Sequence, residues 1–410
     1  MRLYLTFVLT AVLAFAAGPP SPAEGAIAAA RQAVDKNPGQ FEAYNSLAAA
    51  LARRARETSD TAYYGQAEEA IAQSLKLSPG NLEAEKERVW ILLGRHEFAK
   101  AREAAMALNR RTRDDIMIYA YLTDANVELG RYDEAEKSAQ RMLDLRPGNQ
   151  PGLIRGAYLR ELFGDIDGAS DFLQKAFRMT RPNETEDRAW LLVQLAHLES
   201  VRGRLDAAET LLEQALKTFP DYHYALSGLA QVRIGQKKYD EAADLLRRHV
   251  AAAPHAENYF YYAETLERAG RLGEAAETFR VFEERARAEM NGSDSANREL
   301  ILYYADRAGH PDEALRVAEM EVSRRRDVHT LDSYAWALYR NGQFAAAKAQ
   351  LDRALAVGIQ DAQMFYHAGE IASKLKQSAE AAKFFRQSLQ ANPASEYSLP
   401  ARDALNKLRS

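Results

Sequence analysis

A short element that ends in alanine recurs along this chain at a nearly constant interval, and this regularity limits the possible folds more than any other feature. Clear copies are GRYDEA at 130–135 and KKYDEA at 237–242. The ten closing alanines are Ala67, Ala101, Ala135, Ala169, Ala208, Ala242, Ala275, Ala314, Ala347 and Ala381. Successive members are 34, 34, 34, 39, 34, 33, 39, 33 and 34 residues apart. This period predicts an array of repeated helical units.

Each unit has the pattern of a pair of helices. In residues 116–147, apolar residues recur at helical spacing, Gly130 interrupts them, and the spacing resumes until Pro147. A small residue usually stands twelve positions before the closing alanine, and two small residues let paired helices approach closely. The Asp and Glu of the motif fall in the first turn of the second helix, where the helix dipole favours negative charge. The charged letters of the motif therefore have a structural role.

Together these features resemble the tetratricopeptide repeat family. Its period, its helix–turn–helix unit and its pair of small residues all match, and a proline follows twelve residues after the alanine in half of the units. These prolines are Pro79, Pro147, Pro220, Pro254 and Pro393. The resemblance implies an all-α, right-handed solenoid of about ten repeats over residues 41–393. Residues 23–38 match a second helix alone and predict a half-repeat at the N-terminal end, and residues 396–410 predict a C-terminal capping helix.

Three polar segments depart from the period. RRARETSD at 53–60 lengthens the first unit, and residues 179–187 and 288–297 account for the two intervals of 39 residues. We expect long loops or lengthened helices there, because a few polar residues do not break a stack whose helices still pack. The alternative is that 179–187 and 288–297 are hinges that divide the solenoid into blocks.

The N-terminus resembles a secretory signal. An uncharged run of 15 residues, 3–17, follows Arg2, and it contains the small-x-small sequence Ala14-Phe15-Ala16. We expect a signal peptide over residues 1–16, cleaved after Ala16, and therefore a periplasmic or secreted protein. The alternative is an inner-membrane anchor through residues 3–17, although this run is shorter than the roughly 20 residues that span a bilayer.

The sequence offers no catalytic constellation. It has no cysteine, its eight histidines are scattered, and it lacks HExxH, GxSxG and Gly-rich phosphate-loop motifs. A net charge of −4 gives no general attraction to nucleic acid. We therefore expect no enzyme, no cofactor, no metal site and no nucleic-acid partner.

The resemblance does point to a binding surface, because in this family the first helices line the concave side and hold ligands. The family register places a set of aromatic side chains there, and all three tryptophans of the chain belong to it. The candidates are Trp90, Tyr158, Trp190, His197, Tyr224, Phe260, Tyr303, Trp336, Tyr339 and Tyr366. Partly open Trp and Tyr dominate many binding hot spots. The alternative is that some of them fill contacts between repeats.

The expected function is a non-enzymatic scaffold or adaptor in the bacterial envelope. Its concave groove would bind a peptide or protein partner, with aromatic anchors for affinity and variation between repeats for specificity. The alternative is a polysaccharide-binding repeat module of an exopolysaccharide export system. The identity of the partner is not encoded in any motif of the chain.

Overall fold

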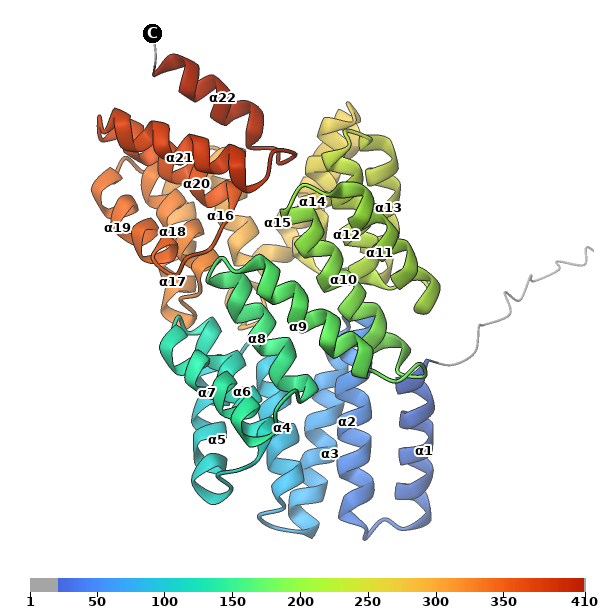
Figure 1. The fold of residues 1–410 in the computed structure, drawn as a ribbon. Helices are drawn as coiled ribbons and strands as arrows, with labels where there is room; N and C mark the ends of the chain where they lie inside the picture. Colours follow the sequence, from blue (N-terminus) through green and yellow to red (C-terminus); the bar gives the residue numbers. More distant parts are fainter. Residues whose placement is uncertain (1–20, 409–410) are drawn as a thin grey trace, which may run out of the picture.

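In the described part of the chain, all regular elements are α-helices, and they are joined by short turns (Figure 1). The structure, a computed structural model, describes residues 21–408. Its twenty-two helices in these residues are α1 (Pro22–Lys36), α2 (Phe41–Thr58), α3 (Ala62–Leu77), α4 (Leu82–Gly94), α5 (Phe98–Arg111), α6 (Ile116–Glu128), α7 (Tyr132–Leu145), α8 (Gln150–Leu162), α9 (Ile166–Met179), α10 (Thr185–Val201), α11 (Leu205–Thr218), α12 (His223–Gly235), α13 (Tyr239–Ala252), α14 (Ala256–Arg268), α15 (Leu272–Glu289), α16 (Asn297–Asp306), α17 (Pro311–Arg324), α18 (Val328–Arg340), α19 (Phe344–Leu355), α20 (Ala362–Lys374), α21 (Ser378–Ala391) and α22 (Ser398–Lys407).

The predicted all-α class and the helix–turn–helix unit are confirmed. Helices α2 to α21 form ten hairpins, α1 precedes the first hairpin, and α22 follows the last. The closing alanines lie in the first turn of each second helix and are buried, as at Ala101 and Ala135, which have no exposed surface. Several first helices begin at an Asn or Asp whose side chain accepts backbone N–H groups, including Asn81 and Asp115.

None of the helices within residues 21–408 is both long enough and apolar enough to cross a membrane. The predicted signal peptide, residues 1–16, lies outside the described residues.

The solenoid coils tightly enough for one superhelical turn to touch the next. Figure 1 shows α16 to α21 lying above α5 to α9, although the two groups are far apart in the sequence. The backbone N–H of Arg326, just before α18, donates to the carbonyl of Glu128 at the end of α6, at 2.8 Å. The backbone N–H of Val328 also donates to the hydroxyl of Tyr132, at 2.9 Å. Hydrogen bonds therefore join residues 196 positions apart.

The contacts between helix ends of different turns share an offset of six hairpins, whereas side chains such as Arg56 also reach across four hairpins, from α2 to α10. His255, which precedes α14, hydrogen-bonds the carbonyl of Ser59 at the end of α2. His96 follows α4 and lies 3.3 Å from Asp294, which precedes α16. Gly164, after α8, contacts the turn before α20. The C-terminal end of each of these helices thus meets the N-terminal end of the helix twelve elements later, an arrangement that the helix dipoles favour.

Two glycines permit this close approach. Gly130 has a φ of +68°, and a Cβ on it would lie 2.5 Å from the carbonyl oxygen of Arg326. Gly164 has a φ of +81°, and a Cβ there would lie 2.7 Å from the carbonyl oxygen of Gly358. The glycine of the recurring motif therefore has a second role at these places, because it both ends a helix and leaves room for the next turn.

The three departures from the repeat period supply much of the contact between turns. Arg56, from the insertion at 53–60, pairs with Glu186 and with Asp187, the latter at 2.6 Å. Glu186 and Asp187 belong to the segment at 179–187, which forms a loop and the lengthened start of α10. The segment at 288–297 lengthens α15 and contributes Asp294. The sequence predicted longer loops and helices at these positions but not their contacts.

Candidate functional site

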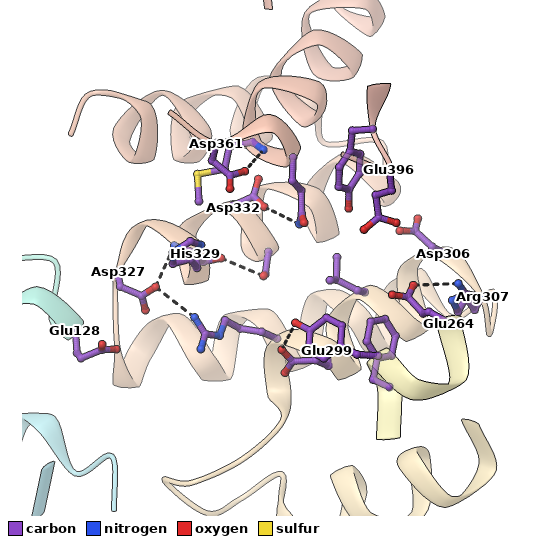
Figure 2. Close-up of a pocket in the computed structure, with 18 of the residues that line it drawn as sticks. Glu128, Glu264, Glu299, Asp306, Arg307, Asp327, His329, Asp332, Asp361 and Glu396 are labelled. Carbon is purple, nitrogen blue, oxygen red and sulfur yellow. Dashed lines mark hydrogen bonds and ion pairs between the residues drawn. The ribbon is translucent and has the colours of Figure 1, made fainter. Parts of the chain in front are cut away.

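A cavity of about 770 Å³ lies where the two superhelical turns face each other (Figure 2). Its walls come from the first helices of the hairpins, namely α6, α8, α14, α16, α18 and α20, and from the segment before α22. This volume falls within the range of small-ligand and peptide-side-chain pockets. The cavity therefore exists only because the solenoid closes on itself.

The lining is strongly acidic. Eight carboxylates face three basic side chains, which are Arg298, Arg307 and His329. Figure 2 shows the acidic residues around the cavity. They are Glu128, Glu264, Glu299, Asp306, Asp327, Asp332, Asp361 and Glu396. Both arginines already have acidic partners, since Arg307 pairs with Glu264 at 3.0 Å and Arg298 lies 3.6 Å from Asp327.

Some of these carboxylates support the fold. Asp327 caps α18 and accepts from the hydroxyl of Thr330 at 2.6 Å. Asp332 is buried and lies 2.8 Å from the Nδ1 atom of His367. Asp361 caps α20 by accepting the N–H of Met364. These side chains would be costly to replace, so they are poor probes of ligand binding.

Other carboxylates are compensated only in part. Glu128 has only Arg325 at 3.9 Å as an ionic partner, and burial together with the neighbouring Asp327 raises its pKa to about 7. Glu264 pairs with Arg307, yet burial and the nearby Glu396 raise its pKa to about 7. In both cases removal of bulk water is the larger cause, and a second carboxylate adds to it. Arg268 and Arg340 pair with Glu396 and Asp306 from outside the lining, but the carboxylates of the cavity still outnumber the cations that pair with them.

Tyrosine rings complete the lining. Tyr158 and Tyr261 are 42% and 38% exposed, which is unusual for large side chains on the inner helices of a solenoid. No arginine or lysine of the described residues stacks on either ring, although five such stacks occur elsewhere, as between Arg307 and Phe279. The exposed rings are thus available to a bound molecule.

Two smaller cavities lie nearby, and one of them adjoins the first. One of about 450 Å³ shares Glu128 and Tyr158 with it and is also lined by Trp190. The other, of about 310 Å³, shares Arg56 with the second cavity and is lined by Tyr224 and Glu257. Glu257 faces the open space of its cavity. The protein around it excludes bulk water and Glu299 adds negative charge nearby, and both raise the pKa of Glu257 to about 7. Several polar cavities therefore lie next to one another along the inner surface.

The profile of the tetratricopeptide repeat family matches residues 193–257 and 335–396. These two stretches of the chain are therefore similar to tetratricopeptide repeats. Among curated proteins the chain is similar to the RNA polymerase-associated protein CTR9 of Caenorhabditis elegans, with 25% identity over 216 residues. The matched region is 46% of this chain and 18% of that protein, so the chain spans less than a fifth of its relative.

Solved structures with helical repeats are also similar to this chain. Yeast Tom70 is 15% identical, with 94% of this chain and 92% of that chain covered and a TM-score of 0.39. Human IFIT1, solved as a dimer with PPP-AAAA, is 12% identical, with 86% and 90% covered and a TM-score of 0.49. The type IV pilus biogenesis factor PilW is 13% identical, with 55% and 100% covered and a TM-score of 0.43.

Four of the ten candidate residues line the cavities of the repeat array. They are Tyr158, Trp190, Tyr224 and Phe260, although Phe260 is only 3% exposed. His197 lies beside them without lining a cavity, with its Nε2 atom 2.6 Å from Glu161. Fewer than half of the candidates that were predicted to face inward therefore lie at a cavity surface.

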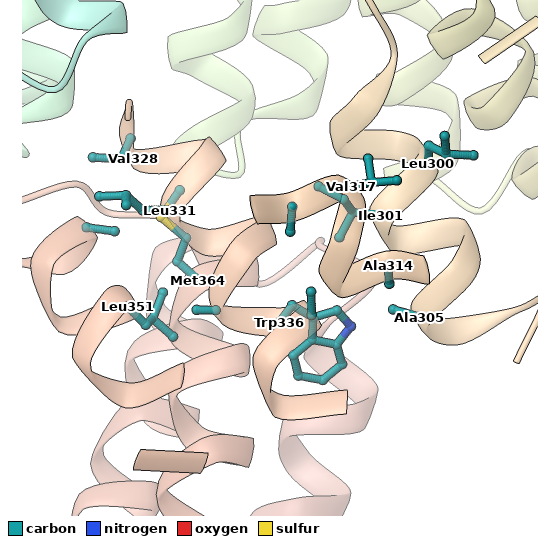
Figure 3. Close-up of a cluster of buried hydrophobic side chains, with 14 of the residues drawn as sticks. Leu300, Ile301, Ala305, Ala314, Val317, Val328, Leu331, Trp336, Leu351 and Met364 are labelled. Atoms are coloured by element: carbon teal, nitrogen blue, oxygen red, sulfur yellow. The ribbon is translucent and has the colours of Figure 1, made fainter. Parts of the chain in front are cut away.

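The remaining aromatic candidates occupy contacts between repeats. Trp336 is 6% exposed within an apolar cluster, where its indole N–H donates to Asp306 at 2.8 Å (Figure 3). Tyr339 is buried and stacks on Trp336 with ring centroids 4.7 Å apart. The partly buried Trp90, Tyr303 and Tyr366 also pack against core side chains. In this conformation these five side chains stabilise the stack.

The sequence did not predict the acidic lining of the cavity. Its carboxylates come from residues between 128 and 396, with one or two per element, and no local motif connects them. The sequence gives one sign of this charge. Several first helices carry an acidic residue on the face that the repeat pattern turns inward, as at Glu264. Within residues 21–408, no three His, Asp or Glu side chains are grouped so that they could hold a metal ion.

Proposed function

We propose that this chain is a non-enzymatic scaffold that binds a peptide or protein partner in its central cavity. Tetratricopeptide repeats serve protein interaction in general. The observation that supports a central binding site is the exposure of Tyr158 and Tyr261 inside the cavity. An exposed tyrosine in a concave site supplies a large contact area at low conformational-entropy cost.

Site-specific photocrosslinking tests this proposal. A photoreactive amino acid at position 158 should crosslink the partner when the protein is recovered from its native host. The same amino acid at Glu103, an exposed position on the second helix α5, is the matched control and should give no such product. Crosslinks from position 103 but none from position 158 would overturn the central site.

We also propose that the protein acts in the bacterial envelope, as a periplasmic or secreted adaptor. The support is the uncharged run at 3–17 and the small-x-small sequence that ends at Ala16. N-terminal sequencing of the protein from a periplasmic fraction checks this, with Ala17 as the expected first residue. A first residue of Met1 in a membrane fraction would instead favour the anchored form.

The alternative ligand is a polysaccharide. Exposed tyrosines suit sugar rings, but the carboxylates of the cavity repel anionic polymers. A polysaccharide ligand is therefore restricted to neutral or cationic polymers. Tryptophan fluorescence of Trp190, which lines the adjoining cavity, would respond to such an oligosaccharide if this alternative holds.

A further inference from the structure

We infer that the segment bound in the central cavity carries arginine or lysine side chains in an extended conformation. This inference rests on the proposed function, because it names the chemistry of the partner at that same site. Three independent features support it, namely the unbalanced charge, the unoccupied tyrosine rings and the shape of the neighbouring cavities.

The charge of the cavity is the first feature. Eight carboxylates line it against two arginines and one histidine, and those arginines are already paired with Glu264 and Asp327. Two further arginines outside the lining, Arg268 and Arg340, pair with Glu396 and Asp306, so the carboxylates remain in excess. Glu128 lacks a close cation, and Glu299 accepts a single hydrogen bond, from the hydroxyl of Tyr261 at 3.0 Å. A guanidinium or ammonium group would supply the missing positive charge and the missing donors. An acidic peptide or a nucleic acid would be repelled.

The tyrosine rings are the second feature. A cation over the face of an aromatic ring is attracted by the ring quadrupole, and a neighbouring carboxylate adds to that attraction. Tyr158 and Glu128 line the same two cavities, and Tyr261 donates to Glu299 in the first one. Each exposed ring thus lies near a carboxylate. This pairing of ring and acid suits a long basic side chain, whose methylene groups contact the ring.

The shape of the space is the third feature. The cavities of about 770 Å³ and 450 Å³ are neighbours, and Glu128 and Tyr158 border both of them. A segment that passes these two residues would occupy both cavities. Together the cavities have room for several side chains but not for a folded domain. An extended segment with basic residues at intervals would reach both tyrosines, and it would gain affinity from more than one cationic contact.

The raised pKa of Glu128 agrees with this assignment. Without a ligand, burial and Asp327 disfavour its charged form, and the cations that face it, Arg298 and Arg325, compensate only in part. A bound cation would favour the carboxylate, so binding near neutral pH should release a proton from this group. In the free protein it costs free energy to keep the Glu128 carboxylate charged, and such a cost is typical of a binding site.

Fluorescence anisotropy with three labelled peptides of equal length tests the inference. In one peptide arginine alternates with alanine, and in the others glutamate or serine takes the place of arginine. We expect the arginine peptide to bind at least about tenfold more tightly than the serine peptide, with an affinity that falls as salt rises. Spermine, a basic ligand without a peptide backbone, should compete only weakly, because it lacks the contacts of the chain.

Variants locate the binding. Glu128→Gln should weaken binding of the arginine peptide about fivefold. Glu103→Gln, which removes the same charge from an exposed position on α5, should leave it unchanged. Glu128→Gln should also raise the melting temperature at pH 8, because it removes a largely buried charge that Arg298 and Arg325 compensate only in part. A fall in both binding and melting temperature would instead assign Glu128 a structural role and contradict the inference.

Each outcome separates the inference from the proposed function. If the serine or glutamate peptide binds as tightly as the arginine peptide, and a photoreactive group at position 158 captures it, the cavity binds peptides but the basic chemistry is wrong. If spermine displaces the arginine peptide fully at equal charge, the site selects cations and not a peptide. If no peptide binds and position 158 captures no partner, both proposals fail.

Discussion

At the scale of single residues, aromatic side chains at the same position of two inner helices have different roles. Tyr158 and Trp336 are each the ninth residue of their helix, yet Tyr158 is exposed in the cavity and Trp336 is buried between repeats. The register predicted the inward face for both of them, but it did not include Tyr261, which is also exposed in the cavity. Their exposure could not be predicted, because it depends on the neighbouring repeat and on the distant superhelical turn.

The buried position of Trp336 predicts a large effect on stability. Trp336→Ala should lower the free energy of unfolding by about 3–5 kcal/mol, because it removes a buried ring that stacks on Tyr339 and on His367. Urea unfolding followed by circular dichroism measures this loss. Trp190→Ala, at a partly buried position beside a cavity, should cost less. Equal losses would contradict the different roles of the two tryptophans.

His223 predicts a dependence of stability on acidity. Burial lowers the pKa of His223 to about 4, with the neighbouring His249 and His255 adding to the shift, while its Nε2 atom lies 3.1 Å from the carbonyl oxygen of Arg56. Because the pKa of His223 is lowered in the folded protein, its contribution to the free energy of unfolding is complete above pH 6.5 and is lost as the pH falls toward 4.

Replacing this histidine should therefore reduce the acid sensitivity of the protein. Between pH 7 and pH 4.5, His223→Gln should lose about 2 kcal/mol less unfolding free energy than the unmodified chain. His310→Gln, at an exposed histidine, serves as the control. Unfolding curves at the two pH values decide the question, and an unchanged acid response in His223→Gln would refute the role of this group.

At the scale of elements, the departures from the 34-residue period matter more than the period itself for the contacts between superhelical turns. The regular units predict hairpins, and the insertions at 53–60, 179–187 and 288–297 bring the hairpins of different turns together through Arg56, Glu186 and Asp294. The sequence showed where the extra residues are and that they are polar. It could not show their partners, because no local pattern links positions more than a hundred residues apart.

The pair of α2 and α10 predicts a measurable contribution to stability. Arg56→Ala leaves the buried Glu186 without its arginine and should cost about 2 kcal/mol, since Arg56 is partly exposed and part of the interaction is screened. Arg247→Ala, which removes an exposed pair with Asp244, should change the unfolding free energy by less than about 0.5 kcal/mol. Urea unfolding of both variants makes the comparison, and similar small changes would exclude a stabilising contact between these helices.

At the scale of the whole molecule, closure of the superhelix creates the cavity. Tetratricopeptide repeats rotate slightly from one unit to the next, and small differences in that rotation decide whether successive turns touch. Here they touch at an offset of six hairpins, with Gly130 and Gly164 beside the turns before α18 and α20. The array and its inner face could be predicted from the sequence, but the closed shape and its acidic lining could not.

Crosslinking between the two turns tests this closed shape most directly. The chain has no native cysteine, so Leu129→Cys and Arg326→Cys introduce a single pair beside the hydrogen bond between Glu128 and Arg326. A short bismaleimide should join the two cysteines within one molecule, and the product should migrate faster than the unlinked chain on a denaturing gel. The pair of Leu129→Cys and Arg247→Cys, with its second member on α13, should give no such product. Absence of the crosslink in the 129–326 pair would show that the turns are apart and that the central cavity does not exist in solution.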